Sequence, residues 1–320
     1  MTAFRPGRRA SALPLFAVVG VLAVAAVLAA GGCGDSVDTA GGGVLDVVAS
    51  ASFLADIAQN LAGGRFEVRS LLPLDTDPHA FEPTPADLRE VATADLVIVN
   101  GGGLEGPLLK TLENAGGEAT LVDASAGLRS RSPRPGEPQL ESSETDPHFW
   151  LDPVLVKTYV ANIRDAFTKA DPGGATEYAA NAAAYTAKLD GLNTWIESQV
   201  ATVPAADRKL VMNHASHGYY ADRYGFSVVG TVIPSAGTDE TPTAKQLSEL
   251  TAAIRASGAK AIFVEIEENP RLAEQIAAET GIVVVDDLLD HSLTEPDGVA
   301  PAYIDMMKFD TRRIVEALRQ

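Results

Sequence analysis

The sequence predicts an α/β protein of two lobes, each with a mainly parallel sheet flanked by helices. From Val44 onward, short apolar segments typical of buried strands alternate with longer amphipathic segments typical of crossover helices. Two long helical stretches, at 153–170 and 175–202, interrupt this alternation once. We therefore expect three parts, an N-terminal lobe at 44–152, linking helices at 153–203 and a C-terminal lobe at 204–320.

An export signal precedes the fold. Residues 1–32 combine a basic start with an uncharged apolar segment of about 18 residues, at the short end of what can cross a bilayer. Small residues then lead into Cys33, the only cysteine, as at a bacterial lipoprotein processing site, although Ala30 stands where leucine is usual. We expect Cys33 to carry a lipid and 33–43 to be a flexible tether, so no disulfide supports the fold. A single-span membrane anchor is the alternative.

The mature chain is strongly acidic. Removal of the signal leaves 288 residues, enough for two domains with sizeable cores. Because the signal holds three arginines and no acid, 22 basic residues face 43 acidic ones, a net charge of −21. This charge argues against binding to nucleic acid or to anionic lipid and is compatible with attracting cations, although solubility alone also explains it.

Four strands and two helices are assigned in the N-terminal lobe. The strands are the apolar segments VLDVVAS, FEVRSLL, ADLVIVN and ATLVDAS, and FLADIAQNLAGG is typical of a helix that ends in glycines. A second helix should begin at Thr84, because its hydroxyl can cap the helix, Pro85 suits the first turn and Asp87 lies near the positive end of the helix dipole. Proline, serine and charged residues make 127–147 a surface loop.

The later elements repeat this pattern. The alanine-rich helix at 175–202 would reach about 40 Å, enough to span two lobes as a rigid connection. In the C-terminal lobe, the strands are KLVMN, SVVGTVI, AIFVE and IVVVDD. The helices between and after them are HGYYADRYG, TAKQLSELTAAIRASG, PRLAEQIAAETG and YIDMMKFDTRRIVEALRQ.

The string Thr-Asp-Pro-His occurs twice, ending at His79 and at His148, in a chain with only five histidines. Proline fixes its own φ and restricts the preceding residue, so each imidazole should stand on a stiff, extended segment. A stiff segment lowers the conformational entropy that is lost when the imidazole is fixed in place around an ion. Asp77 and Asp146 could orient the imidazoles, but a turn-forming role is the simpler interpretation.

Metal-ligating side chains follow the strands of both lobes. Ligands of open α/β sheets bind beyond the carboxyl ends of the strands. His79 and His148 precede the long helix, whereas His214 directly follows KLVMN and Asp287 directly follows IVVVD. Between the lobes, three imidazoles and a carboxylate would complete a tetrahedral set for zinc.

Five strings of the sequence resemble, in order and spacing, the zinc and manganese solute-binding lipoproteins of bacterial ABC importers, the cluster A-I metal-binding family. These strings are TDPHAFEPTPADL, DPHFWLDP, NHASHGYYADRYGF, IFVEIEENPRLAEQIAAETG and VVVDDLL. The resemblance covers 44–320. It implies two lobes joined by one rigid helix and an ion held by His, His, His or Glu, and Asp. Carried over motif by motif, the implied metal ligands are His79, His148, His214 and Asp287.

The resemblance also bears on the choice of metal. Manganese-preferring members commonly have Glu as the third ligand, so His214 favours zinc, as nitrogen donors do in general. The histidine-rich loop of many zinc-specific members is missing, which keeps manganese open. His217 is expected in the cleft wall, with a spare ligand as the alternative, and His291 on a surface loop. Two acids could replace Asp287, namely Asp286 and Glu265.

The expected function is high-affinity capture of a divalent transition metal outside the cytoplasmic membrane and its delivery to an ABC permease. We expect a monomer anchored by its lipid at the cell surface or in the periplasm, without catalysis; adhesion, proposed for relatives, is not tested by the sequence. A secreted zinc hydrolase is the main rival, but four protein ligands leave no position for water, and H-E-x-x-H and G-x-S-x-G motifs are absent. A receptor for an organic solute would need basic residues, and the strings TDPH and NHASH contain none.

Overall fold

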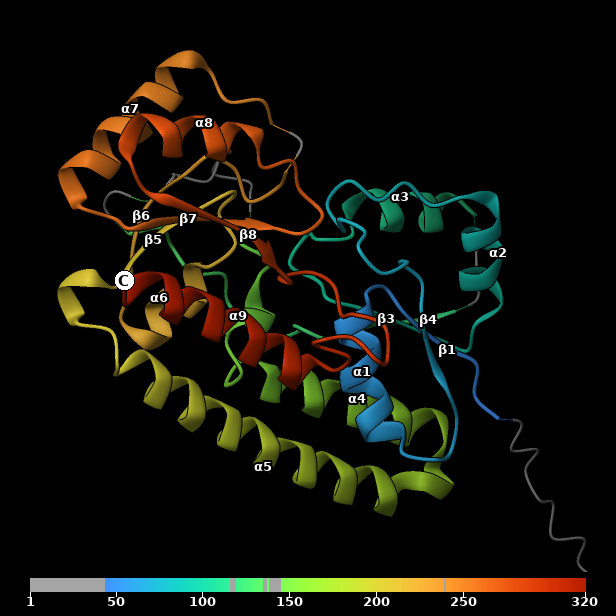
Figure 1. Ribbon diagram of the computed structural model, residues 1–320. Coiled ribbons are helices and arrows are strands. Elements are labelled where there is room, and N and C mark those ends of the chain that lie inside the picture. Colours follow the sequence, from blue (N-terminus) through green and yellow to red (C-terminus); the bar gives the residue numbers. More distant parts are fainter. Residues whose placement is uncertain (1–43, 116–118, 135–136, 138–144, 239) are drawn as a thin grey trace, which may run out of the picture. The chain divides into compact units, whose positions relative to one another are not determined.

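Two parallel four-stranded sheets form the framework of the computed structural model (Figure 1). The N-terminal sheet has the order β2-β1-β3-β4, with strands Val47–Ala49 (β1), Val68–Ser70 (β2), Leu96–Val99 (β3) and Thr120–Asp123 (β4). The C-terminal sheet has the order β6-β5-β7-β8, with strands Lys209–Met212 (β5), Ser227–Thr231 (β6), Ala261–Glu265 (β7) and Val283–Leu288 (β8). Both therefore have the same topology, and the predicted fold class is confirmed.

Residues 44–115, 119–134, 137, 145–238 and 240–320 are described by the structure. They fall within one compact unit, 42–320. The predicted signal, the lipidated Cys33 and the tether at 33–43 lie outside the described residues. Among the helices of the described part, none combines the length and the hydrophobicity needed to cross a bilayer.

Helices cover both faces of the N-terminal sheet. Along β3, Leu96 and Ile98 face one apolar cluster, whereas Val97 and Val99 face another, because successive side chains of a strand point to opposite faces. Helix α1 (Ser52–Ala62) packs on the first face, and α2 (Pro85–Thr93) and α3 (Gly106–Ala115) cover the second. Thr84 caps α2 in a capping box, as predicted, whereas α3 is an additional, unpredicted helix.

The C-terminal sheet is covered in the same way. Helices α7 (Ala244–Ser257) and α8 (Arg271–Thr280) share an apolar cluster with one face of the sheet. Helices α6 (Gly218–Tyr224) and α9 (Tyr303–Leu318) lie on the other face, within the larger cluster that also contains α1. The main core therefore runs continuously from one sheet to the other.

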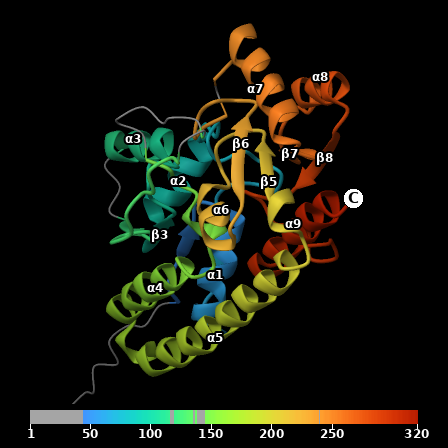
Figure 2. The same ribbon diagram turned by 90° about the vertical axis from the view of Figure 1, so that its left-hand side faces the viewer.

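Two helices connect the sheets, α4 (Val156–Ala170) and the 26-residue α5 (Ala175–Val200). Helix α5 packs against α1, α4 and α9, and Figure 2 shows it running below α1 and α9. The predicted long helix is thus present, and it contacts helices that cover both sheets. One-turn 3-10 helices complete the elements, at Phe149–Leu151, Pro172–Gly174 and Ala205–Asp207.

Candidate metal centre

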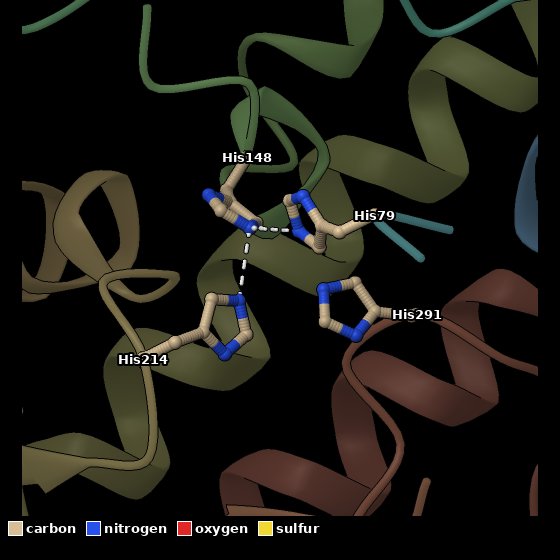
Figure 3. Close-up of side chains that lie close together, drawn as sticks. All are labelled: His79, His148, His214 and His291. Atoms are coloured by element: carbon tan, nitrogen blue, oxygen red, sulfur yellow. Dashed lines mark hydrogen bonds between the residues drawn. The ribbon is translucent and has the colours of Figure 1, made fainter. Parts of the chain in front are cut away.

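Four imidazoles converge at the carboxyl ends of the two sheets. His79, His148, His214 and His291 each offer one ring nitrogen, and these four atoms lie within 4.8 Å of one another (Figure 3). Nε2 of His148 is 3.2 Å from Nε2 of His79 and 3.2 Å from Nε2 of His214. His79 is half-buried and the other three are buried. We call these four residues the histidine cluster.

The connections after strands supply all four rings. His79 follows β2 and His148 follows β4 in the chain, whereas His214 comes two residues after β5 and His291 three residues after β8. Each sheet thus contributes two rings, from the edge where ligands of parallel sheets bind. The three predicted histidines come together as expected.

The repeated Thr-Asp-Pro-His string forms the same turn in both places. Asp77 accepts a hydrogen bond from the backbone N–H of His79 at 2.8 Å, and Asp146 accepts one from that of His148 at 3.1 Å. Both aspartates therefore act as turn formers, the simpler of the two predicted roles. Oδ1 of Asp146 also lies 2.9 Å from Nδ1 of His148. That contact orients the ring, so its Nε2 faces the cluster.

Glu265 stands behind His214. Oε1 of this carboxyl, at the last residue of β7, lies 3.0 Å from Nδ1 of His214, at ion-pair distance but without the alignment of a hydrogen bond. Both side chains are fully buried. The sequence leaves Glu265 as an alternative to Asp287 for the carboxylate ligand. It lies nearby instead, on the side of the His214 ring that faces away from the other imidazoles' Nε2 atoms.

Asp287 does not join the histidine cluster, and this prediction is corrected. Its carboxylate pairs with Arg313 of α9 at 2.8 Å, and its side chain is 40% exposed. Asp286 is exposed as well. The reason is that β8 continues to Leu288, so the acids belong to the strand and the chain enters the site only after it.

His291 was expected on a surface loop, but it is buried and belongs to the cluster. Its neighbour Asp290 is buried too, with Oδ2 accepting a hydrogen bond from Ser216 at 3.0 Å and lying 3.2 Å from Nδ1 of His217. The other oxygen, Oδ1, has no hydrogen-bond partner among the described residues. His217 therefore contacts Asp290 and is not one of the four clustered rings. In the sequence, the only indication of this placement is that an aspartate and a histidine, Asp290 and His291, stand side by side shortly after a predicted strand.

Burial sets the protonation of these groups. It lowers the pKa of His148, His214 and His291, and neighbouring imidazoles lower the pKa of His148 and His291 further. Neutral rings keep the lone pairs that a metal ion needs. Burial raises the pKa of Asp290, but the charge and the hydrogen bond of His217 outweigh this and hold that pKa below its usual value. The site thus combines the neutral rings of His148, His214 and His291 with the ionised, buried carboxylate of Asp290.

Comparison with known proteins gives matches along nearly the whole described chain. A family model described as zinc-uptake complex component A, periplasmic, matches residues 47–317. The manganese-binding lipoprotein MntA of Halalkalibacterium halodurans is 34% identical over 301 residues, which cover 94% of this chain and 97% of the relative. The manganese ABC transporter substrate-binding lipoprotein PsaA of Streptococcus pneumoniae serotype 4 is 29% identical over 302 residues, with 93% and 97% covered.

Solved structures share the fold. The periplasmic zinc-binding protein TroA of Treponema pallidum superposes with a TM-score of 0.78 at 26% identity, covering 87% of this chain and 100% of that one. A manganese-bound periplasmic metal-binding protein from Candidatus Liberibacter asiaticus gives 0.74 at 27% identity, with 85% and 98% covered. The similarity therefore includes proteins described with either metal.

Proposed function

Because the chain belongs to the family of zinc-uptake complex component A, we propose that it captures a divalent transition metal outside the cytoplasmic membrane and delivers it to an ABC permease. The observation that carries the proposal is the convergence of four imidazoles, three of them buried, from both sheets. Four nitrogen atoms this close together, three of them on buried rings whose pKa is lowered, form a ready site for an ion. The ion is cargo and not a resident cofactor.

Zinc is the proposed cargo, with manganese as the alternative. Imidazole suits zinc, whereas manganese prefers carboxylate, carbonyl and water oxygens. The names of the relatives include both metals, since MntA and PsaA are described as manganese proteins and TroA as a zinc protein. The nitrogen-rich cluster is what favours zinc in this chain.

We infer that Nε2 atoms of His79, His148 and His214 bind the ion. The fourth ligand comes from the adjacent pair Asp290 and His291. His291 already lies within the cluster, and Asp290 offers a buried carboxylate oxygen that lacks a hydrogen-bond partner. Asp290 thus replaces Asp287 as the carboxylate that the family resemblance implies.

Capture without catalysis fits this geometry better than zinc-dependent hydrolysis. A catalytic zinc keeps an open position for water beside three protein ligands. Here, four imidazole nitrogens lie within 4.8 Å of one another, which is enough to fill the positions of a tetrahedral ion with protein atoms. The site is also complete within one chain, which supports a monomer as the functional unit.

The proposed location is the outer surface of the cytoplasmic membrane. MntA and PsaA are both named lipoproteins, and PsaA is named as the substrate-binding lipoprotein of a manganese ABC transporter. A lipid on Cys33 would hold the soluble part close to its permease, with 33–43 as the tether.

The test is metal titration of the chain from Gly34 on, which contains the compact unit 42–320. Metal-stripped protein is titrated with zinc and manganese in competition, and bound metal is counted by mass spectrometry. We expect one equivalent of zinc, held in preference to manganese and lost or greatly weakened in His214→Ala. A preference for manganese would overturn the choice of cargo, and stoichiometric binding of neither ion would overturn the proposed function.

A further inference from the structure

A buried phenol joins the segment before His148 to the helix after His214. Oη of Tyr219, on α6, donates to the backbone carbonyl of Asp146 at 2.9 Å and accepts from the backbone N–H of Arg131 at 3.1 Å. Asp146 comes two residues before His148 in the chain. The phenol therefore connects two segments that each present a ring of the histidine cluster.

The guanidinium of Arg131 reinforces this connection. Its Nε donates to Oδ2 of Asp222 on α6 at 3.0 Å, and its Nη2 donates to Oδ1 at 3.3 Å. The two groups therefore form a bidentate pair. Such paired, charge-assisted hydrogen bonds are among the stronger ones in proteins. The Arg131 side chain is only 10% exposed, so water screens the pair less than it would at the surface.

Gly218 makes room for the guanidinium. It is the first residue of α6, and a Cβ atom at this position would lie 2.4 Å from Nη1 of Arg131, closer than real side chains approach. Arg131 therefore rests directly on the start of the helix. Arg131, Asp146, His214 and Gly218 also line one small pocket, so the contact lies beside the histidine cluster.

Asp146 connects the contact with Tyr219 to His148, which is a proposed metal ligand. Its carbonyl accepts from Tyr219, its N–H donates to Ser130 at 2.9 Å, and its carboxylate holds both the backbone and the Nδ1 atom of His148. Movement of Asp146 away from α6 would carry the His148 ring away from His214. We call the contacts of Arg131 and Asp146 with Tyr219 and Asp222 the α6 bridge.

We propose that Arg131 and Tyr219 are positioning residues that hold His148 beside His214 through the α6 bridge and so slow the release of the bound ion. This inference rests on the proposed function. An ion shared by His148 and His214 leaves when its ligands separate, and the α6 bridge opposes that separation. Loss of the bridge therefore accelerates metal dissociation while the ligands themselves stay in place.

The experiment measures zinc dissociation from the loaded chain, from Gly34 on, after mixing with excess coloured chelator. Three variants weaken the bridge in different ways: Asp222→Asn, Tyr219→Phe and Gly218→Ala. Asp171→Asn is the matched control, because it removes the charge from another partly exposed Arg–Asp pair, with Arg65. We expect dissociation about tenfold faster in the three variants, the effect of losing roughly one strong hydrogen bond, and an unchanged rate in the control.

Gly218→Ala tests the bridge from the side of the helix, because the added Cβ would meet the Arg131 guanidinium at 2.4 Å and displace it. The bridge predicts faster dissociation in this variant, with one zinc still bound. A role confined to folding predicts a lower midpoint of thermal unfolding of the metal-free protein and an unchanged dissociation rate.

Wild-type dissociation rates in Tyr219→Phe and Asp222→Asn, with one zinc bound in each, would overturn the inference and leave the proposed function standing. Failure of the wild-type chain to bind zinc would overturn both.

Discussion

Nδ1 of His214 lies 3.0 Å from Oε1 of Glu265, and neither side chain reaches solvent. A ring that gives the Nε2 lone pair to an ion must carry its proton on Nδ1, which is the atom that faces Glu265. The carboxyl lies close enough to accept that proton, although the two groups are not aligned for a hydrogen bond in this structure, and such a bond would fix the tautomer of His214 needed for binding. Asp146 is the corresponding partner of His148, and in this pair Oδ1 and Nδ1 do form a hydrogen bond, at 2.9 Å.

Replacement of Glu265 by glutamine should weaken zinc binding by about 10- to 100-fold, the usual cost of losing a partner of a metal-ligating histidine. The amide keeps the shape of the side chain but cannot accept the proton from Nδ1 as strongly. Competition with a chelator of known affinity measures the change. Glu279→Gln, the same substitution at an exposed position of α8, should leave the affinity unchanged.

Zinc affinity should fall as the pH is lowered through about 7. Burial raises the pKa of Asp146 to about 7, against the lowering effects of the His148 backbone N–H and of Arg131. A protonated Asp146 would donate to Nδ1 of His148 and move the ring proton to Nε2, where it blocks the ion. Protons thus compete with zinc below this pH, by up to about tenfold per unit for this group.

Affinities measured from pH 5.5 to 8 check this dependence. Asp146→Asn should bind more weakly throughout and lose this part of the slope, because the amide does not titrate. An equal slope in the variant and the wild type would show that Asp146 is not the group concerned.

Removal of the His217 imidazole should destabilise the metal-free protein by about 1–3 kcal/mol, because it leaves the buried Asp290 carboxylate with fewer partners. Urea unfolding of His217→Phe measures this loss. Saturating zinc should reduce the difference from the wild type, since the ion supplies the missing positive charge beside Asp290. The same difference with and without zinc would contradict a place for Asp290 at the ion.

Asp287→Asn should bind zinc like the wild type, whereas Asp290→Asn and His291→Ala should each bind more weakly. Asp287 forms a partly exposed pair with Arg313, and such pairs contribute about 0–1 kcal/mol to stability. Metal titration and thermal unfolding of the three variants test both statements. Loss of zinc binding in Asp287→Asn alone would restore the sequence-based assignment.

The alternation of short apolar and long amphipathic segments was sufficient to predict both sheets. It works because each strand of a parallel sheet is covered on both faces, as β3 is, so that its apolar character is continuous. Helix α3 was not assigned, and the end of β8 was placed too early. Asp286 and Asp287 interrupt the apolar segment of β8, so the pattern of apolar residues alone places the end of the strand at them.

Three of the four clustered histidines were predictable because rare residues stood in repeated strings or directly after strands. His291 and Asp290 were missed because the extra length of β8 decides which residues enter the site. The α6 bridge had no signal in the sequence. It depends on how the loop before His148 packs on a helix from the other sheet, and residues such as Arg131 and Asp222 look like ordinary surface charges in the pattern.

The most direct test of the account is the structure of the zinc-loaded protein, with the ion located by its anomalous scattering. We expect one ion bound by Nε2 of His79, His148 and His214 at about 2.0–2.1 Å, with the fourth ligand from Asp290 or His291. An ion held at Asp287, or one that leaves any of the three Nε2 atoms uncoordinated, would contradict it.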